Sequence, residues 1–282
     1  MSEHWYKNGK LADHSHADWP KTKAGTPRVT PSKAMMVGLG FKPSVTSILS
    51  VIGAYGGLMH WYAQKGRDAL LELIREGGFS PGLLTMFPEE EWKDRLKSLT
   101  TAAAEEGTRF HKCIEDFLTT EEKLPDDRPA RQAAINVYNW IESRGLSGGK
   151  KEHIVEIDDP MHPKEVSWRK SRAPQVYVDL PYAGTVDYWV EKDGVIWVID
   201  IKTKNTKRDC RPKWDHAAQL AAYAHALRAD CMLFRCVNLY ISRETGEIGK
   251  EKAWTDKEIR KGHELFEQAC SVWLTMNTEK IT

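Results

Sequence analysis

A chain of 282 residues with 41% hydrophobic and 29% charged residues has the composition of a globular protein. No run approaches the roughly 18 to 20 apolar residues of a transmembrane helix, and the first residues lack the apolar stretch of a secretion signal. The five cysteines include no closely spaced pair, which favours reduced thiols and argues against structural zinc. We therefore expect an intracellular, cytoplasmic protein, and the net charge of +1 does not by itself indicate a polyanionic partner.

The first half of the chain is expected to be irregular and then helical. Residues 1–40 are polar, with scattered proline, glycine and histidine, which predicts a partly ordered arm or a short hairpin. Helices are predicted over residues 58–75, 88–118 and 128–144. Glycines end the first and last of these helices, acids fill the first turn of the second, and Gly107 is a candidate break in it. Residues 41–150 are therefore expected to form a mainly helical lobe.

The second half, residues 151–282, is expected to form a sheet with helices. Strands are predicted over residues 152–157, 175–180, 182–192, 195–203 and 231–242, with a short one after residue 246, and helices over residues 214–228 and 256–276. Residues 158–174 read as a polar insertion that contains prolines. This order predicts an α+β or mixed α/β core in one domain over residues 41–282.

A hairpin in this half carries an unusual pair of acids. Asp193-Gly194 between two runs rich in β-branched and aromatic residues predicts a two-residue turn. Counting outward from that turn places Asp187 opposite Asp200, with Lys202 on the same face. Directly opposed like charges destabilise a sheet, and a hard divalent cation between them would remove the conflict. The alternative is an ordinary surface ion pair at a sheet edge.

Two helical pairs accompany the hairpin. His111 and Glu115 are four residues apart, so they share one helix face, either as a simple surface pair or as a metal ligand with its orienting acid. Gln219 and Tyr223 have the same spacing on an alanine-rich helix that can pack closely on the sheet. These two side chains either contact a phosphate and a base or belong to a helix surface with a buried tyrosine.

Basic residues cluster on both sides of the hairpin in sequence. Six of the twelve residues from Lys202 to Lys213 are basic, and a second group surrounds residue 168. Charged loops are often merely solvated, but a polyanionic substrate would have to lie beside these two clusters. Three tryptophans in or near these segments are candidates for base stacking: Trp168, Trp189 and Trp214.

Taken in order, four motifs resemble those of the PD-(D/E)XK nuclease superfamily. They are Gly107-Thr-x-x-His111, Ala183-Gly-Thr-Val-Asp187, Val198-Ile-Asp200-Ile-Lys202-Thr203 and Gln219-x-x-x-Tyr223. The resemblance covers residues 43 to 225 and is greatest to the branch with the RecB nuclease domain, CRISPR-adaptation nucleases, phage RecE-type exonucleases and the mitochondrial genome maintenance exonuclease. It implies a restriction-endonuclease-like core, in which a mixed central sheet is flanked by helices.

The resemblance also implies roles for individual residues. Metal ions would be bound by His111, Asp187, Asp200 and the backbone carbonyl of Ile201, and Lys202 would be the catalytic lysine beside the two aspartates. DNA contacts would come from Gln219, Tyr223, Lys204, Lys207, Arg208, Arg211, Lys213, Trp168 and Arg169. Secondary candidates are Glu115 and Glu156. Some relatives hold an iron–sulfur cluster, which is not expected here because their C-terminal cysteine group is absent.

The implied activity is that of a Mg²⁺- or Mn²⁺-dependent deoxyribonuclease. It would act as an exonuclease on DNA ends with little sequence specificity, in phage or bacterial recombination, repair or processing. A phage enzyme would work in the host cytoplasm, and a single-strand annealing recombination protein is a candidate partner. One alternative is a structure-specific or restriction-type endonuclease of the same fold. Another is a non-catalytic DNA-binding or scaffold module, which would have no need of opposed carboxylates.

Overall fold

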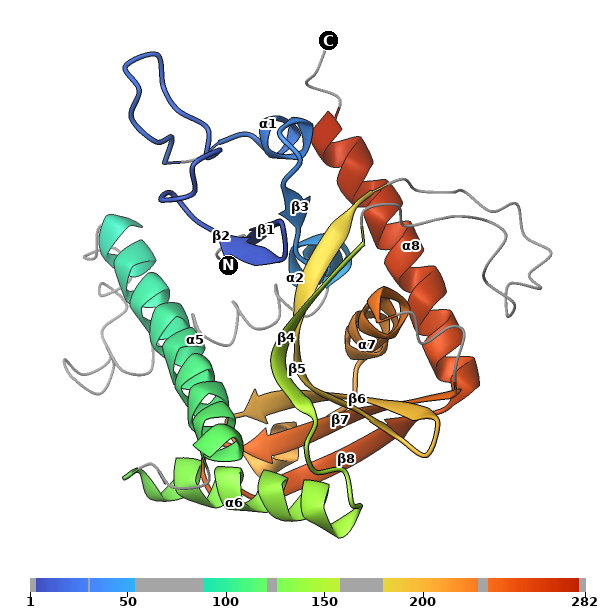
Figure 1. The fold of residues 1–282 in the computed structure, drawn as a ribbon. Helices are drawn as coiled ribbons and strands as arrows, with labels where there is room; N and C mark the ends of the chain where they lie inside the picture. The colour runs from blue at the N-terminus through green and yellow to red at the C-terminus, as the bar shows by residue number, and fades with distance from the viewer. Residues whose placement is uncertain are drawn as a thin grey trace.

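The computed structural model describes residues 4–29, 31–53, 89–120, 126–157, 180–227 and 233–278. A five-stranded sheet lies at the centre, in the order β4-β5-β6-β7-β8 (Figure 1). Its strands are β4 (Lys150–Ile157), β5 (Tyr182–Lys192), β6 (Val195–Lys204), β7 (Leu233–Ser242) and β8 (Ile248–Trp254). Strands β6 and β7 run parallel and the other neighbours antiparallel, so the sheet is mixed, as predicted.

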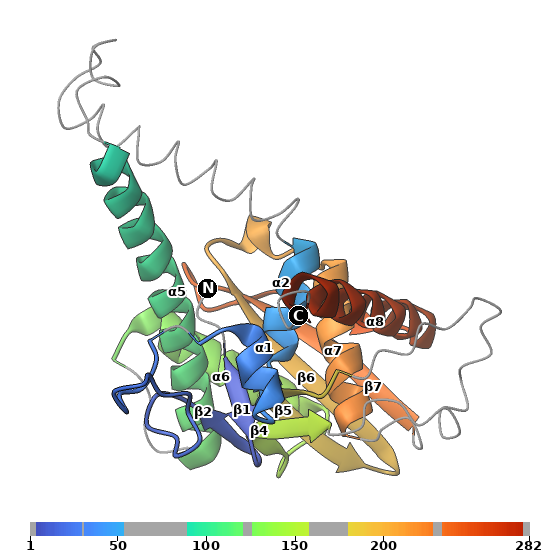
Figure 2. The ribbon, with the colours of Figure 1, turned by 90° about the horizontal axis from the view of Figure 1, so that it is seen from above.

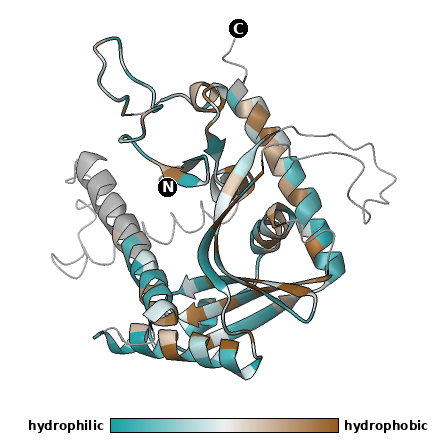
Figure 3. Ribbon diagram, in the orientation of Figure 1, coloured by the Kyte–Doolittle hydropathy of each residue, from teal (hydrophilic) through white to brown (hydrophobic). Residues whose placement is uncertain are grey.

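Helices cover both faces of this sheet. They are α1 (Lys33–Gly38), α2 (Val45–Gly53), α5 (Glu89–Thr120), α6 (Arg128–Ser143), α7 (Trp214–Ala226) and α8 (Asp256–Thr278). Figures 1 and 2 show α5 and α6 on one side of the sheet and α7 and α8 on the other. In Figure 3, α6 and α8 alternate hydrophobic and hydrophilic residues, as helices do when they bury one face.

Two hydrophobic cores lie between these layers, one on each face of the sheet. On one face, Val198 packs with the alanines of α7 and with Phe266 and Trp273 of α8. On the other face, Ile199 and Ile201 pack with residues of α5 and α6. Because successive side chains of β6 point to opposite faces, this single strand contributes to both cores.

The hairpin between β5 and β6 has the predicted two-residue turn. Lys192 pairs with Val195, and both turn residues, Asp193 (φ 52°) and Gly194 (φ 72°), lie in the left-handed region. Left-handed conformations at both central positions define the turn type that fits the twist of a hairpin. The turn that positions the two aspartates by counting is therefore confirmed.

The N-terminal residues form a small sheet of three strands, in the order β2-β1-β3. The strands are β1 (Trp5–Lys7), β2 (Lys10–Ala12) and β3 (Lys42–Pro43). Hydrogen bonds join this sheet to the large one: the Tyr6 and Thr185 hydroxyls lie 3.1 Å apart, and the Gly9 amide donates to Glu156. The segment expected as a partly ordered arm thus contains the predicted hairpin and packs against β4 and β5.

One helical expectation needs correction. Helix α5 continues through Gly107, where we considered a break. A Cβ atom at Gly107 would lie 3.4 Å from the Thr203 hydroxyl, so this position faces β6. Helix α2 (Val45–Gly53) was not predicted. The predictions for residues 58–75, 158–174 and 175–179 lie outside the described residues. No helix in the described ranges is long and apolar enough to cross a membrane.

Candidate active site

Strand β6 places a buried ion pair beneath α7. Asp200 is 2% exposed, and the Lys202 Nζ atom lies 3.0 and 2.9 Å from its two carboxylate oxygens. Burial, opposed by Lys202 and reinforced by the nearby Asp187, raises the pKa of Asp200 to about 6. Burial also opposes the charge of Lys202, but Asp200 and Asp187 outweigh it and raise the lysine pKa. The charge of the buried Asp200 carboxylate therefore depends on the partly exposed Lys202 amine beside it.

Asp187 reaches the same space from β5. The paired ladder between β5 and β6 ends at Tyr188 and Ile199, one position before the two aspartates. Beyond that point, Asp187 Oδ2 accepts a hydrogen bond from the backbone amide of Ile201 at 2.6 Å. A side-chain oxygen thus replaces the backbone ladder where Asp187 and Asp200 come together. Counting from the turn predicted that Asp187 and Asp200 pair directly, but the regular strand pairing ends one residue before them.

Helix α5 brings His111 to this group. The His111 Nδ1 atom lies 3.8 Å from Asp187 Oδ2, and the imidazole is partly exposed. Glu115 does not hold the histidine: its carboxylate lies 3.2 Å from Lys112. Helix α5 therefore places His111 beside Asp187, while Glu115 pairs with a lysine of its own helix and acts electrostatically on Glu152 of β4.

Gln219 and Tyr223 lie on the other side of Lys202. Lys202 donates to the Gln219 side-chain carbonyl at 2.7 Å, and the Gln219 amide donates to the Tyr223 hydroxyl at 2.9 Å. Both residues are buried. Tyr223 fits there because Gly184 has no side chain: a Cβ atom at Gly184 would lie 2.6 Å from the tyrosine ring. In this arrangement the pair positions the lysine amine and does not present an open contact surface.

Asn238 on β7 forms a hydrogen bond with Asp200. This residue was not identified from the sequence. Its amide donates to Asp200 Oδ2 at 2.7 Å, and its carbonyl accepts from Trp254 Nε1 at 2.7 Å. Asn238 is fully buried and pairs with Asp200 in the parallel ladder between β6 and β7. The sequence did offer a signal: Asn238 is a polar amide within the apolar run of a predicted strand. A buried amide needs hydrogen-bond partners, so its position indicated a polar partner nearby.

Glu152 on β4 is a second residue that sequence reasoning missed. Pairing between β4 and β5 skips Glu152 and Asp187, and Glu152 has a left-handed backbone (φ 43°). Burial, then the charges of Asp187 and Glu115, raise the pKa of its carboxyl group to about 8. The strand was predicted, but a long insertion separates it from β5. The register between the two strands, and therefore the residue that faces Asp187, could not be counted from the sequence.

The remaining predicted residues lie outside this group. Glu156 forms an ion pair with Lys42 at 3.1 Å and accepts from the Gly9 amide, so it anchors the N-terminal sheet. Lys207 pairs with Glu247 at 3.3 Å. The other basic loop residues are exposed or partly exposed: Lys204, Arg208, Arg211 and Lys213. Trp168 and Arg169 lie outside the described residues.

The oxygen atoms of this site suit a hard divalent cation. Asp187 and Asp200 are carboxylate donors, and the Ile201 carbonyl follows directly in β6. In the described part of the chain, no three His, Cys, Asp or Glu side chains are arranged so that they alone could hold a metal ion. Magnesium commonly uses one or two carboxylates and keeps several waters, so two aspartates with a backbone carbonyl fit it without a full protein cage.

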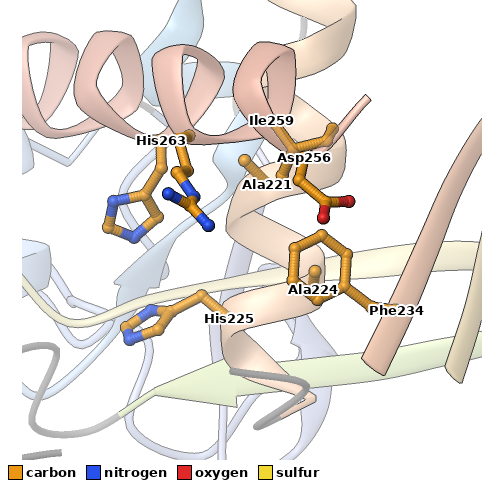
Figure 4. Close-up of a pocket in the computed structure, with 8 residues that line it drawn as sticks. Ala221, Ala224, His225, Phe234, Asp256, Ile259 and His263 are labelled. Atoms are coloured by element: carbon orange, nitrogen blue, oxygen red, sulfur yellow. The ribbon is translucent and has the colours of Figure 1, made fainter. Parts of the chain in front are cut away.

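A separate cavity of about 70 Å³ lies between α7, α8 and β7 (Figure 4). It is lined by Ala221, Ala224, His225, Phe234, Asp256, Ile259, Arg260 and His263. The lining residues of α7 lie on a different face of that helix from Gln219 and Tyr223. None of the predicted site residues contributes to this cavity.

Comparison with known proteins gives one extended match. The sequence pattern of the PD-(D/E)XK nuclease superfamily matches residues 89–270, well over half of the 282 residues. None of the curated proteins matches the chain.

Among solved structures, a "Putative exonuclease" from Eubacterium rectale aligns with a TM-score of 0.40 and 11% identity, over 63% of this chain and 69% of that one. The structure of SSO0001 aligns with a TM-score of 0.31 and 15% identity, over 64% and 67%. Scores this low add nothing to the match in sequence pattern. That match spans α5, the two site strands and α7, and by it the chain belongs to the PD-(D/E)XK nuclease superfamily.

Proposed function

We propose that this nuclease is a metal-dependent DNA exonuclease, which hydrolyses phosphodiester bonds from DNA ends with little sequence specificity. The observation that carries the proposal is the ion pair of the buried Asp200 with Lys202, with Asp187 beside it, inside the segment that matches the superfamily. A buried charge pair is rarely a net source of stability, because removing two charges from water costs as much as their attraction returns. A catalytic use explains why this pair lies there.

Each residue of the group has a role in this chemistry. PD-(D/E)XK nucleases generally use divalent metal ions, and a bound Mg²⁺ or Mn²⁺ would lower the pKa of a water molecule and stabilise charge on the phosphate. Asp187, Asp200 and the Ile201 carbonyl would hold the ion, with His111 as a nitrogen ligand that Mn²⁺ accepts. Lys202 is aimed by Gln219 and stabilises negative charge that develops on the phosphate.

Preference for DNA ends is supported by the resemblance to the branch of RecB, CRISPR-adaptation, RecE-type and mitochondrial exonucleases. The exposed basic residues after β6 suit contacts to phosphates, which carry no sequence information. The same resemblance supports a role in phage or bacterial recombination, repair or processing, in the host cytoplasm for a phage enzyme. A single-strand annealing recombination protein would be a natural partner there.

The proposal is tested with end-labelled linear DNA and covalently closed circular DNA, incubated with Mg²⁺, Mn²⁺ or a chelator. We expect release of nucleotides from linear single- or double-stranded DNA, with metal only, and no cutting of the circle. The Lys202→Ala variant should lose the activity, whereas Lys257→Ala, which removes an exposed lysine on α8, should retain it.

Two outcomes would replace the proposal. Cutting of the closed circle would identify an endonuclease of the same fold, either structure-specific or of the restriction type. Binding of DNA without metal-dependent cleavage, and without calorimetric binding of Mg²⁺ or Mn²⁺, would identify a non-catalytic DNA-binding or scaffold module.

A further inference from the structure

We propose that Trp214 forms a stacking subsite for one base of a bound nucleic acid strand, beside the candidate active site. The inference rests on the proposed function only in that the substrate is a nucleic acid. It concerns a position at the start of α7 that the catalytic group does not use.

Trp214 is exposed in a way that the other described aromatic residues are not. It is 49% exposed, and among the described residues it is the only aromatic side chain in the group of strongly exposed large hydrophobic ones. The ring is supported from one side by Trp254, whose centroid lies 6.1 Å away at an interplanar angle of 42°. An indole that is supported by a second indole and is about half exposed offers a surface on which a base can stack.

The support beneath Trp214 is buried and is connected to the active site by hydrogen bonds. Trp254 is buried, and its Nε1 atom donates to Asn238, whose amide in turn donates to Asp200, both at 2.7 Å. Two fully buried hydrogen bonds therefore link the indole that supports Trp214 to a proposed metal ligand. Such a connection fixes the platform before a strand binds, which reduces the entropy cost of binding.

Positive charge surrounds this platform. The Lys261 Nζ atom lies 6.0 Å from the centre of the Trp214 ring, and Lys252 lies 4.7 Å from that of Trp254. Lys213 precedes the tryptophan and acts electrostatically on His216 together with Lys202 and Lys204.

The nearby acids balance only part of this charge. Asp215 acts electrostatically on Lys204, and Glu258 pairs with Lys252 at 2.7 Å. Within the described ranges, no carboxylate pairs with Lys204, Lys213 or Lys261. Positive charge therefore continues from the catalytic lysine to Trp214 around the start of α7, as a phosphate backbone would require.

Helix α7 connects the platform to the active site. Trp214 precedes Gln219 by five residues, which corresponds to about 7.5 Å along the axis of α7. A base on Trp214 would therefore belong to a nucleotide beyond the one whose phosphate lies at Lys202.

The positive charge also indicates whether the surface around Trp214 binds a nucleic acid or a second copy of this chain. A symmetric contact between two copies would place the lysines around Trp214 opposite the same lysines of the partner, since such an interface uses one patch twice. Like charges brought together in this way repel, whereas the phosphates of a strand neutralise them. The patch is therefore complementary to a polyanion.

The experiment combines protein variants with single abasic sites in the strand. Binding of fluorescein-labelled single-stranded oligonucleotides is measured by anisotropy with a chelator present, so that nothing is cleaved. We expect Trp214→Ala to weaken binding roughly 5- to 150-fold, the loss typical of one stacked base, and Trp214→Phe to lose far less. Val272→Ala, at an exposed apolar position on α8, serves as the control and should bind as the wild type does.

The abasic site identifies the stacked base. Its removal at one position should weaken binding by the wild type but not by Trp214→Ala, because the alanine variant has already lost that contact. Equal losses for both proteins at every position would overturn the subsite. So would a Trp214→Ala protein that binds normally but has lost self-association in sedimentation, since the patch would then be an interface between copies.

The same data separate this inference from the proposed function. A wild-type protein that binds no nucleic acid would overturn both. Binding that depends on Trp214, together with no metal-dependent cleavage, would support the subsite and overturn the exonuclease. Metal-dependent cleavage, together with binding that depends neither on Trp214 nor on any single base, would support the exonuclease and overturn the subsite.

Discussion

The two faces of β6 differ sharply although they belong to one strand. Ile199 and Ile201 point into the apolar core against α5 and α6, whereas Asp200 and Lys202 lie beneath α7 in a network of polar side chains. Alternation along the strand places hydrophobic residues and charges within one residue of each other. On the face toward α5 and α6 the strand stays apolar, whereas on the face toward α7 the apolar packing of Val198 gives way to the charges of Asp200 and Lys202.

The largest expected effect comes from the charged face. Asp200→Asn keeps the size of the side chain and an acceptor for Asn238, but it removes the negative charge from the site. We expect the rate of DNA cleavage to fall by at least about 100-fold, the loss usual for one electrostatic contact in an active site. Single-turnover cleavage of end-labelled DNA measures it, and a rate within a few-fold of the wild type would refute the role of Asp200.

The apolar face should respond in the opposite way. Ile199 is fully buried, and Ile199→Ala should lower the free energy of unfolding by about 2–5 kcal/mol because it removes packed methyl groups and leaves a cavity. Urea unfolding measures the change, and cleavage by the protein that remains folded should be close to normal. A large loss of activity in fully folded Ile199→Ala would show that the two faces are not separable.

His216 tests whether the face beneath α7 is truly dry. Its imidazole lies 2.7 Å from the Tyr240 hydroxyl, and burial, followed by the nearby lysines, lowers its pKa to about 2. The unfolded chain takes up a proton near pH 6.5, so stability present above that pH is lost as the pH falls towards 2. One such group costs about 2 kcal/mol at pH 5, since each pH unit below 6.5 contributes about 1.4 kcal/mol.

The measurement is urea unfolding of the wild type and of His216→Gln at pH 7 and pH 5. The variant should lose less stability over this interval, because glutamine takes up no proton. Identical pH dependence of the two proteins would show that His216 is hydrated and titrates normally.

Glu152 should give the smallest effect, with the opposite sign. A carboxyl group whose folded pKa is raised to about 8 destabilises the protein at pH values above the ordinary pKa, and this cost grows until pH 8. Because the side chain is only partly buried, Glu152→Gln should stabilise the protein by about 1 kcal/mol at pH 7. The gain should disappear at pH 4, and a variant less stable than the wild type at pH 7 would contradict the account.

The hairpin shows what the sequence predicts well. The Asp193-Gly194 turn fixes the register locally, so the meeting of Asp187, Asp200 and Lys202 follows from counting residues. The helical spacing of Gln219 and Tyr223 predicted a shared face, and the hydrogen bond between them agrees with it. Features determined within one element or one tight turn are accessible without coordinates.

Contacts between distant elements were less accessible. Glu152 faces Asp187 across a long insertion, and Asn238 reaches Asp200 only because β7 returns in parallel after α7. Glu156 was a secondary candidate for the site but pairs with Lys42, which the N-terminal sheet brings there. No local pattern encodes these partners, since each depends on how the strands are ordered in the sheet.

The most direct test of the central claim is calorimetric titration of Mn²⁺ into the wild type and into Asp187→Asn, without DNA. If Asp187 and Asp200 together hold the catalytic ion, the wild type should show saturable binding and the variant should bind at least tenfold more weakly, while both unfold at similar urea concentrations. Equal Mn²⁺ binding by the two folded proteins would contradict the claim that these aspartates form the metal site.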